Sequence, residues 1–219
     1  LEMETIINDM PAIKTGLYRV FDKNKIIKPS FSPFWLMPDV NSDVELAKKY
    51  NISGSEISLY AVPDKAEDLY YIMPLEYEIP IEYVNLICLA SSELEAHVPS
   101  EKRILTQEQA RKYTAEIGFK IIYETAKREG INIGITAAEE VEKAKFLAEI
   151  LAKYTAGMGI LEVFLEDGNV QDVYIDAPVS KNKIYLGIGN VGNAKLRSKL
   201  KTNVQLSLRE AESLLSRFR

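Results

Sequence analysis

The sequence predicts an α+β protein, in which a helical layer packs with a small mixed or antiparallel sheet and the chain forms two subdomains. Two long segments place apolar residues at steps of three and four, which is the period of an amphipathic helix. Short alternating runs on both sides of these segments indicate strands. With 219 residues, of which 47% are hydrophobic and 27% charged, the chain can bury a core without disulfides or metal ions.

Residues 1–104 are expected to form an N-terminal α+β subdomain with an extended, proline-rich lead. Four prolines and an aromatic cluster before residue 40 favour an extended segment laid over a core. Ser42 and Glu45 have the spacing of a capping box, so a short helix is predicted from there to about Tyr50. Strands at 56–62 and 69–73, joined as a hairpin, and a buried helix at 81–97 complete this part.

Residues 105–219 are expected to form a helical pair, followed by a small α/β sheet subdomain that leads to a linker. Thr106 with Gln109 predicts the start of one long helix, and Thr136 with Glu139 predicts the start of the next. The elements expected after them are a short helix at 160–165, strands at 170–176, 183–188 and 203–206, and a last helix from 207. No stop signal follows that helix, so we expect the natural chain to continue beyond Arg219.

The rare residues exclude several kinds of site. There is one cysteine, Cys88, and one histidine, His97, so neither a four-ligand zinc site nor a CxxC redox centre can form. Carboxylate metal sites stay open, but no metal ligands are assigned. The simplest interpretation makes Cys88 a small buried hydrophobic residue and places His97 in the last turn of a helix. None of the 11 glycines is followed by lysine, so the chain alone has no Walker A motif, and we expect neither enzymatic activity nor a cofactor of its own.

Charge is distributed unevenly along the chain. With 27 basic and 32 acidic residues the net charge is −5, and no nucleic-acid partner is expected. Between Ala177 and Leu208, however, there are six basic residues and no acid. This segment is either a solvated hairpin or a surface that binds phosphate or an acidic protein. The lysines of this basic hairpin surface are Lys181, Lys183, Lys195, Lys199 and Lys201.

Residues 187–192 spell GIGNVG, which formally matches the GxGxxG pattern of dinucleotide-binding loops. Such a loop must open a helix that faces the pyrophosphate, but the residues that follow have poor helical amphipathicity. Glycine and asparagine are also what a tight turn requires. The sequence therefore favours a hairpin tip over a cofactor loop.

A more specific pattern occupies residues 154–178, YTAGMGILEVFLEDGNVQDVYIDAP. It resembles the segment ahead of the motor core in the secretion ATPases of type II and type IV systems, which include archaeal pilus and archaellum motors. In that family a helix ends in a G-x-G turn, an L-E-x-L-L-like half-helix follows, and a D-x-x-V-x-D-V-x-I strand comes next. Residues 202–219 are similar to the family's strand and helix that lead to the linker, whereas the first 100 residues match only in layout.

The resemblance implies an N-terminal regulatory and assembly domain of a hexameric motor, which covers nucleotide held by a C-terminal domain. The family's Walker motifs would lie beyond Arg219, so ATP and magnesium belong to the full-length protein. The residues that the resemblance suggests for reaching nucleotide phosphates are Arg197, Arg217 and Arg219. The implied partners are the chain's own C-terminal ATPase domain, the neighbouring subunits of a homohexamer, and a membrane platform protein.

On this interpretation the protein is cytoplasmic, associates peripherally with the inner face of the cell membrane, and serves protein transport or pilus assembly. Two other functions remain open. One is a stand-alone protein-interaction module without nucleotide chemistry, which docks a partner through the proline-rich lead or the basic hairpin. The other is a small-molecule enzyme that uses the glycine-rich tip.

Overall fold

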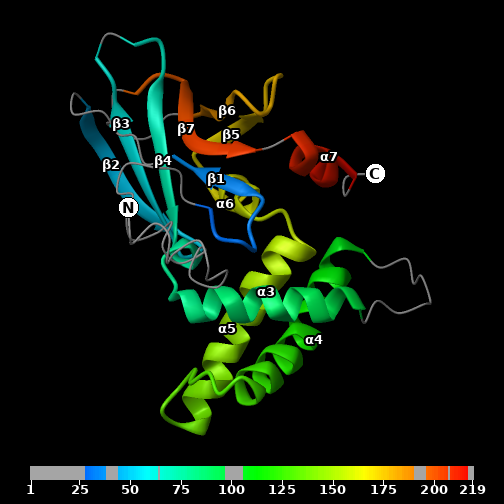
Figure 1. Cartoon of the computed structure of the whole chain (residues 1–219). Coiled ribbons are helices and arrows are strands. Elements are labelled where there is room, and N and C mark those ends of the chain that lie inside the picture. Colours follow the sequence, from blue (N-terminus) through cyan, green and yellow to red (C-terminus); the bar gives the residue numbers. More distant parts are fainter. Residues whose placement is uncertain are drawn as a thin grey trace, which may run out of the picture. The chain divides into compact units, whose positions relative to one another are not determined.

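The computed structural model describes residues 28–37, 44–63, 65–96, 106–189, 196–206 and 208–216. These residues form two compact units (Figure 1). The helical unit contains Pro29–Ser32 and Ile79–Gly159. The sheet unit contains Pro33–Glu78 and the described residues from Ile160 onward. The units therefore do not follow the expected division between residues 104 and 105, which themselves lie outside the described ranges.

The helical unit consists of α3 (Ile81–Ala96), α4 (Gln107–Arg128) and α5 (Ala137–Thr155), with α4 and α5 side by side (Figure 1). The capping box predicted for α4 is confirmed. Gln109 N–H donates to Thr106 Oγ1 over 3.3 Å, and Thr106 N–H donates to Gln109 Oε1 over 2.9 Å. At α5 the Thr136 hydroxyl accepts from Glu139 N–H over 3.2 Å, as its spacing predicts.

The buried faces of the two long helices agree with the sequence to different degrees. In α5 the steps of three and four predict a buried stripe of Val141, Ala144, Leu147, Leu151 and Tyr154. All of these are buried except Val141, which is half-buried. In α4 the same spacing predicts a buried stripe through Tyr113 and Ile121. Ile121 is buried, but Tyr113 is 39% exposed, whereas Thr114 and Thr125 are buried. The prediction for Tyr113 was wrong because α4 contacts both α3 and α5, so its buried surface is wider than one stripe and shifted around the helix.

The sheet unit contains seven described strands in the order β2-β3-β4-β7-β6-β5, with β1 pairing with β7. The β4–β7 pair is parallel and the other recorded pairs are antiparallel, so the predicted α+β class with a mixed sheet is confirmed. The strands are β1 (Phe34–Leu36), β2 (Glu45–Ile52), β3 (Ser55–Ala61), β4 (Asp68–Pro74), β5 (Val170–Tyr174), β6 (Lys183–Ile188) and β7 (Lys199–Leu206). The unit also includes a 3-10 helix η1 (Leu75–Tyr77) and the helices α6 (Ile160–Glu166) and α7 (Leu208–Ser216).

One prediction was wrong: a helix was expected from Ser42 to about Tyr50, but the structure has strand β2 at Glu45–Ile52. Ser42, the expected cap, lies outside the described residues. Strand β2 pairs with β3 through a tight turn at Ser53 and Gly54, which have φ values of 47° and 76°. The residues of β2 are good helix formers, but pairing with β3 overrides that local preference.

One face of the sheet forms the core of this unit. Ile57, Tyr70 and Leu186 are fully buried there, and the ring of Phe164 on α6 meets Tyr70 edge-on at 5.6 Å. Asn203 of β7 is also buried, and its side-chain amide both accepts from Ile72 N–H and donates to the Ile72 carbonyl, each over 2.9 Å. This amide ties β7 to β4 just beyond their three paired positions.

Candidate functional site

Arg197 is held inside the sheet unit by Asp68. Its backbone N–H donates to Asp68 Oδ2 over 2.7 Å, and its guanidinium Nη1 donates to Asp68 Oδ1 over 3.0 Å and to the Val62 carbonyl over 3.1 Å. The Asp68 side chain is only 4% exposed, whereas that of Arg197 is 44% exposed. The guanidinium group expected to reach a nucleotide phosphate therefore has a carboxylate partner that joins the start of β4 to the residues just before β7.

The other predicted basic residues divide into two sets. Arg217, Arg219 and Lys195 lie outside the described residues. The remaining four lysines belong to the sheet unit: Lys181 precedes β6, Lys183 begins it, and Lys199 and Lys201 lie on β7. Because β6 and β7 are antiparallel neighbours, the predicted hairpin is confirmed.

Two tyrosines that the sequence analysis did not single out lie beside these lysines. Tyr174 of β5 is opposite Tyr185 of β6, and Tyr185 is opposite Lys201 of β7, so the three side chains share one face of the sheet. Lys199 Nζ lies 4.8 Å from the centre of the Tyr185 ring and 5.5 Å from that of Tyr174. Lys201 Nζ lies 6.0 Å from the Tyr185 ring centre. We call Tyr174, Tyr185, Lys199 and Lys201 the basic–tyrosine face.

One acidic residue, Asp172 of β5, lies on the same face, because it is opposite Gly187 of β6 and Gly187 is opposite Lys199 of β7. The Tyr174 hydroxyl donates to Asp172 Oδ2 over 3.3 Å, and the nearby carboxylate raises the pKa of Tyr174. Gly187 of β6 makes room for both residues, because a Cβ atom there would lie 3.2 Å from the Asp172 carboxylate and 3.4 Å from the Tyr174 ring. The first glycine of the GxGxxG pattern therefore permits close side-chain packing across the strands.

The glycine pattern does not form a dinucleotide loop in its described part. Gly187 lies within β6 and Gly189 directly follows it, and the Gly189 N–H donates to the Asn169 carbonyl over 2.9 Å. The next described residues lead into β7, which returns antiparallel to β6, and Gly192 lies outside the described residues. A dinucleotide site needs a strand, a glycine turn and then a helix. The strand-to-strand arrangement agrees with the hairpin that the sequence favoured.

The most heavily hydrogen-bonded carboxylate described in the sheet unit belongs to Asp167, which is 1% exposed. Its Oδ2 accepts from the hydroxyls of Tyr50, over 2.7 Å, and Tyr70, over 2.8 Å. Its Oδ1 accepts from the backbone N–H of Asn169, over 2.9 Å, and from that residue's side-chain amide, over 2.8 Å. Burial, together with the Asp167 charge, raises the pKa of both tyrosines. The arrangement joins β2, β4 and the turn before β5.

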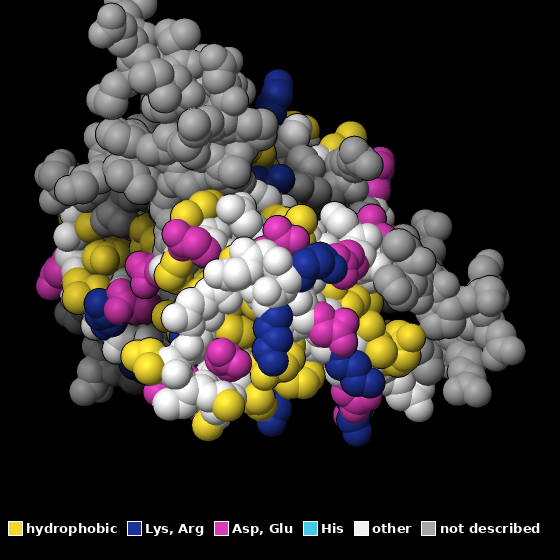
Figure 2. Space-filling view, turned by 60° about the horizontal axis from the view of Figure 1, so that its bottom comes forward, with side chains coloured by type: hydrophobic (Ala, Val, Ile, Leu, Met, Phe, Trp, Pro, Cys, Tyr) yellow, Lys and Arg dark blue, Asp and Glu magenta, His cyan; other side chains and the backbone are white. Residues whose placement is uncertain are grey.

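The helical unit has a groove of about 610 Å³ along α4 and α5, with an apolar floor that includes Phe119. Four basic and three acidic side chains line the groove, so its lining does not favour ligands of either charge. Figure 2 shows the helical unit from the end that is lowest in Figure 1, and there, too, positive, negative and hydrophobic side chains are interspersed. A second hollow, of about 410 Å³, lies by Ile133 and Phe146.

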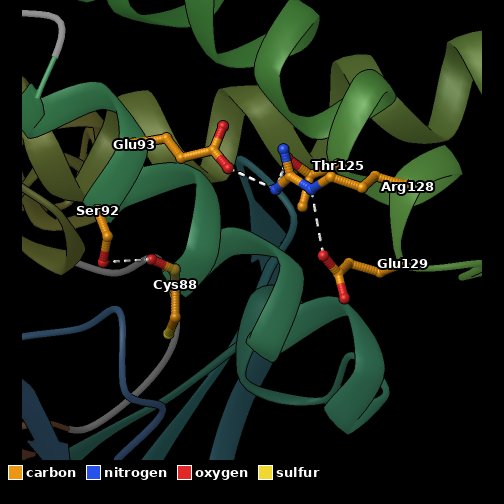
Figure 3. A network of polar contacts seen from close by, with 6 residues as sticks. All are labelled: Cys88, Ser92, Glu93, Thr125, Arg128 and Glu129. Carbon is orange, nitrogen blue, oxygen red and sulfur yellow. Dashed lines mark hydrogen bonds and ion pairs between the residues drawn. The ribbon is translucent and has the colours of Figure 1, made fainter.

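A polar network joins α3 to the C-terminal end of α4 (Figure 3). Arg128 pairs with Glu93 of α3 and with its own neighbour Glu129, and the hydrogen bond to Glu93 is the largest cause of the raised pKa of Arg128. Cys88 was expected to be buried but is half-buried, and burial raises the pKa of its thiol. The carbonyl of Cys88 accepts from the Ser92 hydroxyl, the contact that a serine side chain commonly makes with the carbonyl four residues earlier in its own helix. His97 lies outside the described residues.

Among the residues that the structure describes, no group of three or more His, Cys, Asp or Glu side chains is placed to hold a metal ion. None of the helices in the described ranges is both long and apolar enough to cross a membrane. In comparisons with known proteins, no family model matches the chain and no curated sequence matches it significantly.

Proposed function

We propose that this chain is the N-terminal regulatory and assembly domain of a hexameric secretion, pilus or archaellum motor ATPase. On this proposal a C-terminal domain encoded beyond Arg219 binds ATP and magnesium, and the present chain caps that nucleotide without hydrolysing it. Its partners are that domain, the neighbouring subunits and a membrane platform protein, at the inner face of the cell membrane.

One observation carries the proposal: the motif residues that resemble the family have local structural roles. Asp167, the first residue of the D-x-x-V pattern, accepts from Asn169 N–H and so shapes the turn from α6 into β5. Asn203, in the TNV sequence of the second resembling segment, holds β7 to β4 through Ile72. The resembling segments thus coincide with the α6–β5 turn and with strand β7 of the sheet unit.

The structure also changes which residues we propose to contact nucleotide. Because Arg197 is paired with the buried Asp68, phosphate contact by its guanidinium would require that ion pair to open. Arg217 and Arg219 are therefore the preferred candidates, since a guanidinium group can donate two parallel hydrogen bonds to phosphate oxygens.

The test is to express the chain together with the coding sequence that follows Arg219. We expect the longer protein to hydrolyse ATP in the presence of magnesium and to form hexamers, whereas residues 1–219 alone show no hydrolysis. A variant of the longer protein without the Walker A lysine is the matched control and should be inactive. A downstream sequence that lacks a P-loop would remove the proposal.

A second candidate function, a stand-alone protein-interaction module, is favoured by helix α7. Leu208 and Leu215 are 58% and 62% exposed, and their spacing of seven residues places them on the same side of the helix. Ala211 and Leu214 of the same helix are buried, so α7 has more apolar surface than its own unit covers. This function would be preferred if the downstream sequence contained no P-loop and the Leu208→Ser/Leu215→Ser variant failed to bind a partner captured by the wild-type chain.

A further inference from the structure

The basic–tyrosine face is not explained by the proposed function. The sequence from Ala177 to Leu208 contains six basic residues and no acid in a chain of net charge −5. Folding places two of these lysines, Lys199 and Lys201, with Tyr174 and Tyr185 on one face of three adjacent strands. Lys183 begins β6, and Lys181 lies in the turn just before it. The face also holds one carboxylate, that of Asp172, which accepts from the Tyr174 hydroxyl. Its two lysines exceed this single acid, so the net charge of the face is positive.

We propose that the basic–tyrosine face docks on an anionic lipid bilayer. Lysine side chains are attracted to the negative surface of such a bilayer. Tyrosine places an apolar ring and a polar hydroxyl at the boundary between lipid and water. Tyr174 is 41% exposed, so the aromatic surface of its ring is open to solvent beside Lys199. This combination of charge, aromatic rings and exposed apolar surface is typical of peripheral membrane contacts.

The geometry favours a bilayer over other anionic partners. Single-stranded nucleic acid binds such sheets by stacking bases on ring faces, but here Lys199 Nζ already lies over both tyrosine rings. A small phosphate ligand is usually held in a concave site, whereas these four side chains lie on a sheet face and none of them lines either hollow of the helical unit. An acidic peptide would match the lysines but would give the exposed ring of Tyr174 no apolar surroundings, which the boundary of a bilayer supplies.

The inference does not depend on the proposed motor, because it concerns this chain alone. The test measures binding of residues 1–219 to phosphatidylcholine vesicles with and without about 30 mol% phosphatidylserine. We expect binding to the anionic vesicles only, weakening as the salt concentration rises. Each lysine contributes about fivefold to such binding, so Lys199→Gln/Lys201→Gln should lower the partition coefficient about thirtyfold.

The matched control is Lys112→Gln/Lys120→Gln, which removes the same charge from the exposed face of α4. It should change the partition coefficient much less, and circular dichroism checks that both variants remain folded. Equal binding to neutral and anionic vesicles would overturn the proposal. It would also be overturned by an equal loss in the two double variants, or by tighter binding of an oligo-uridine or a poly-glutamate peptide than of the vesicles.

Discussion

At the scale of single residues, Asp167 and its two tyrosine partners determine how the inner part of the sheet unit responds to pH. The Tyr70 hydroxyl is buried and donates to Asp167 Oδ2, so ionising the phenol would place two negative charges together away from water. Burial is the largest cause of the raised pKa of Tyr70, and the Asp167 charge is the next. The folded protein therefore retains the Tyr70 proton at pH values where the unfolded chain releases it.

The first prediction concerns this proton. The pKa of Tyr70 is raised by folding above its ordinary value of 10.0, so its contribution to stability is complete below pH 10 and is lost as the pH rises further. At pH 11 the loss from Tyr70 alone should be about 1.4 kcal/mol in the free energy of unfolding. Urea unfolding of the wild type and of Tyr70→Phe at pH 8 and pH 11 measures it.

The Tyr70→Phe variant separates this effect from other groups that titrate at high pH. It should be less stable than the wild type at pH 8, by about 1–2 kcal/mol, because the hydrogen bond to a buried carboxylate is lost. The difference in stability between the two proteins should be smaller at pH 11. At that pH, unfolding lets the wild type release the proton of Tyr70, whereas the variant has no such proton. A difference that stays constant from pH 8 to pH 11 would contradict the raised pKa.

At the scale of elements, the connection between α4 and α5 depends on a glycine for steric reasons. A Cβ atom at Gly134 would lie 2.5 Å from the backbone nitrogen of Glu140 and 2.8 Å from the carbonyl carbon of Glu139. Backbone atoms of a helix start cannot move aside as the end of a flexible side chain can. The connection therefore approaches the first turn of α5 more closely than any residue with a side chain permits.

The second prediction follows from that close approach. Gly134→Ala should lower the free energy of unfolding by about 1–3 kcal/mol, because the connection must shift away from α5. Gly168→Ala is the matched control, since a Cβ atom there has no neighbour within 4 Å. It should leave stability unchanged or slightly raised. Thermal unfolding followed by circular dichroism measures both variants, and equal losses would show that the steric explanation is wrong.

At the scale of the whole molecule, the sheet unit is built from two separate parts of the chain. Strands β1 to β4 come before the helices α3 to α5 in sequence, and β5 to β7 come after them. The parallel pairing of β4 with β7 and the hydrogen bond from Tyr70 to Asp167 join the two parts. A cut between residues 104 and 105, where the sequence suggested a boundary, therefore divides this sheet.

The third prediction is that neither residues 1–104 nor residues 105–219 fold cooperatively alone. Each fragment lacks the strands that pair with β4 or β7, so buried apolar side chains and backbone groups of the sheet would meet water. Residues 79–159, which hold α3, α4 and α5, should instead retain a helical circular dichroism spectrum. A sharp urea transition in the 105–219 fragment would contradict the observed division.

Much of the element list could be predicted from the sequence, because its causes are local. The capping residues Thr106 and Thr136 act over three residues, and the antiparallel pair of β3 and β4 joins strands that are close in sequence. Strand β2 could not be predicted in this way, since its residues favour a helix and only pairing with β3 makes them extended. The one available signal was the Ser53-Gly54 pair, which suits a tight hairpin turn.

The candidate sites show the same division between local and distant causes. Sequence alone determined that Lys199 and Lys201 lie in an acid-free segment, and that the chain contains no Walker A motif. Only the tertiary structure decided that Tyr174 and Tyr185 share a face with those lysines, and that Arg197 pairs with Asp68. The physical reason is distance along the chain: caps and charge runs act between near neighbours, whereas strand pairing and ion pairs join residues far apart in sequence.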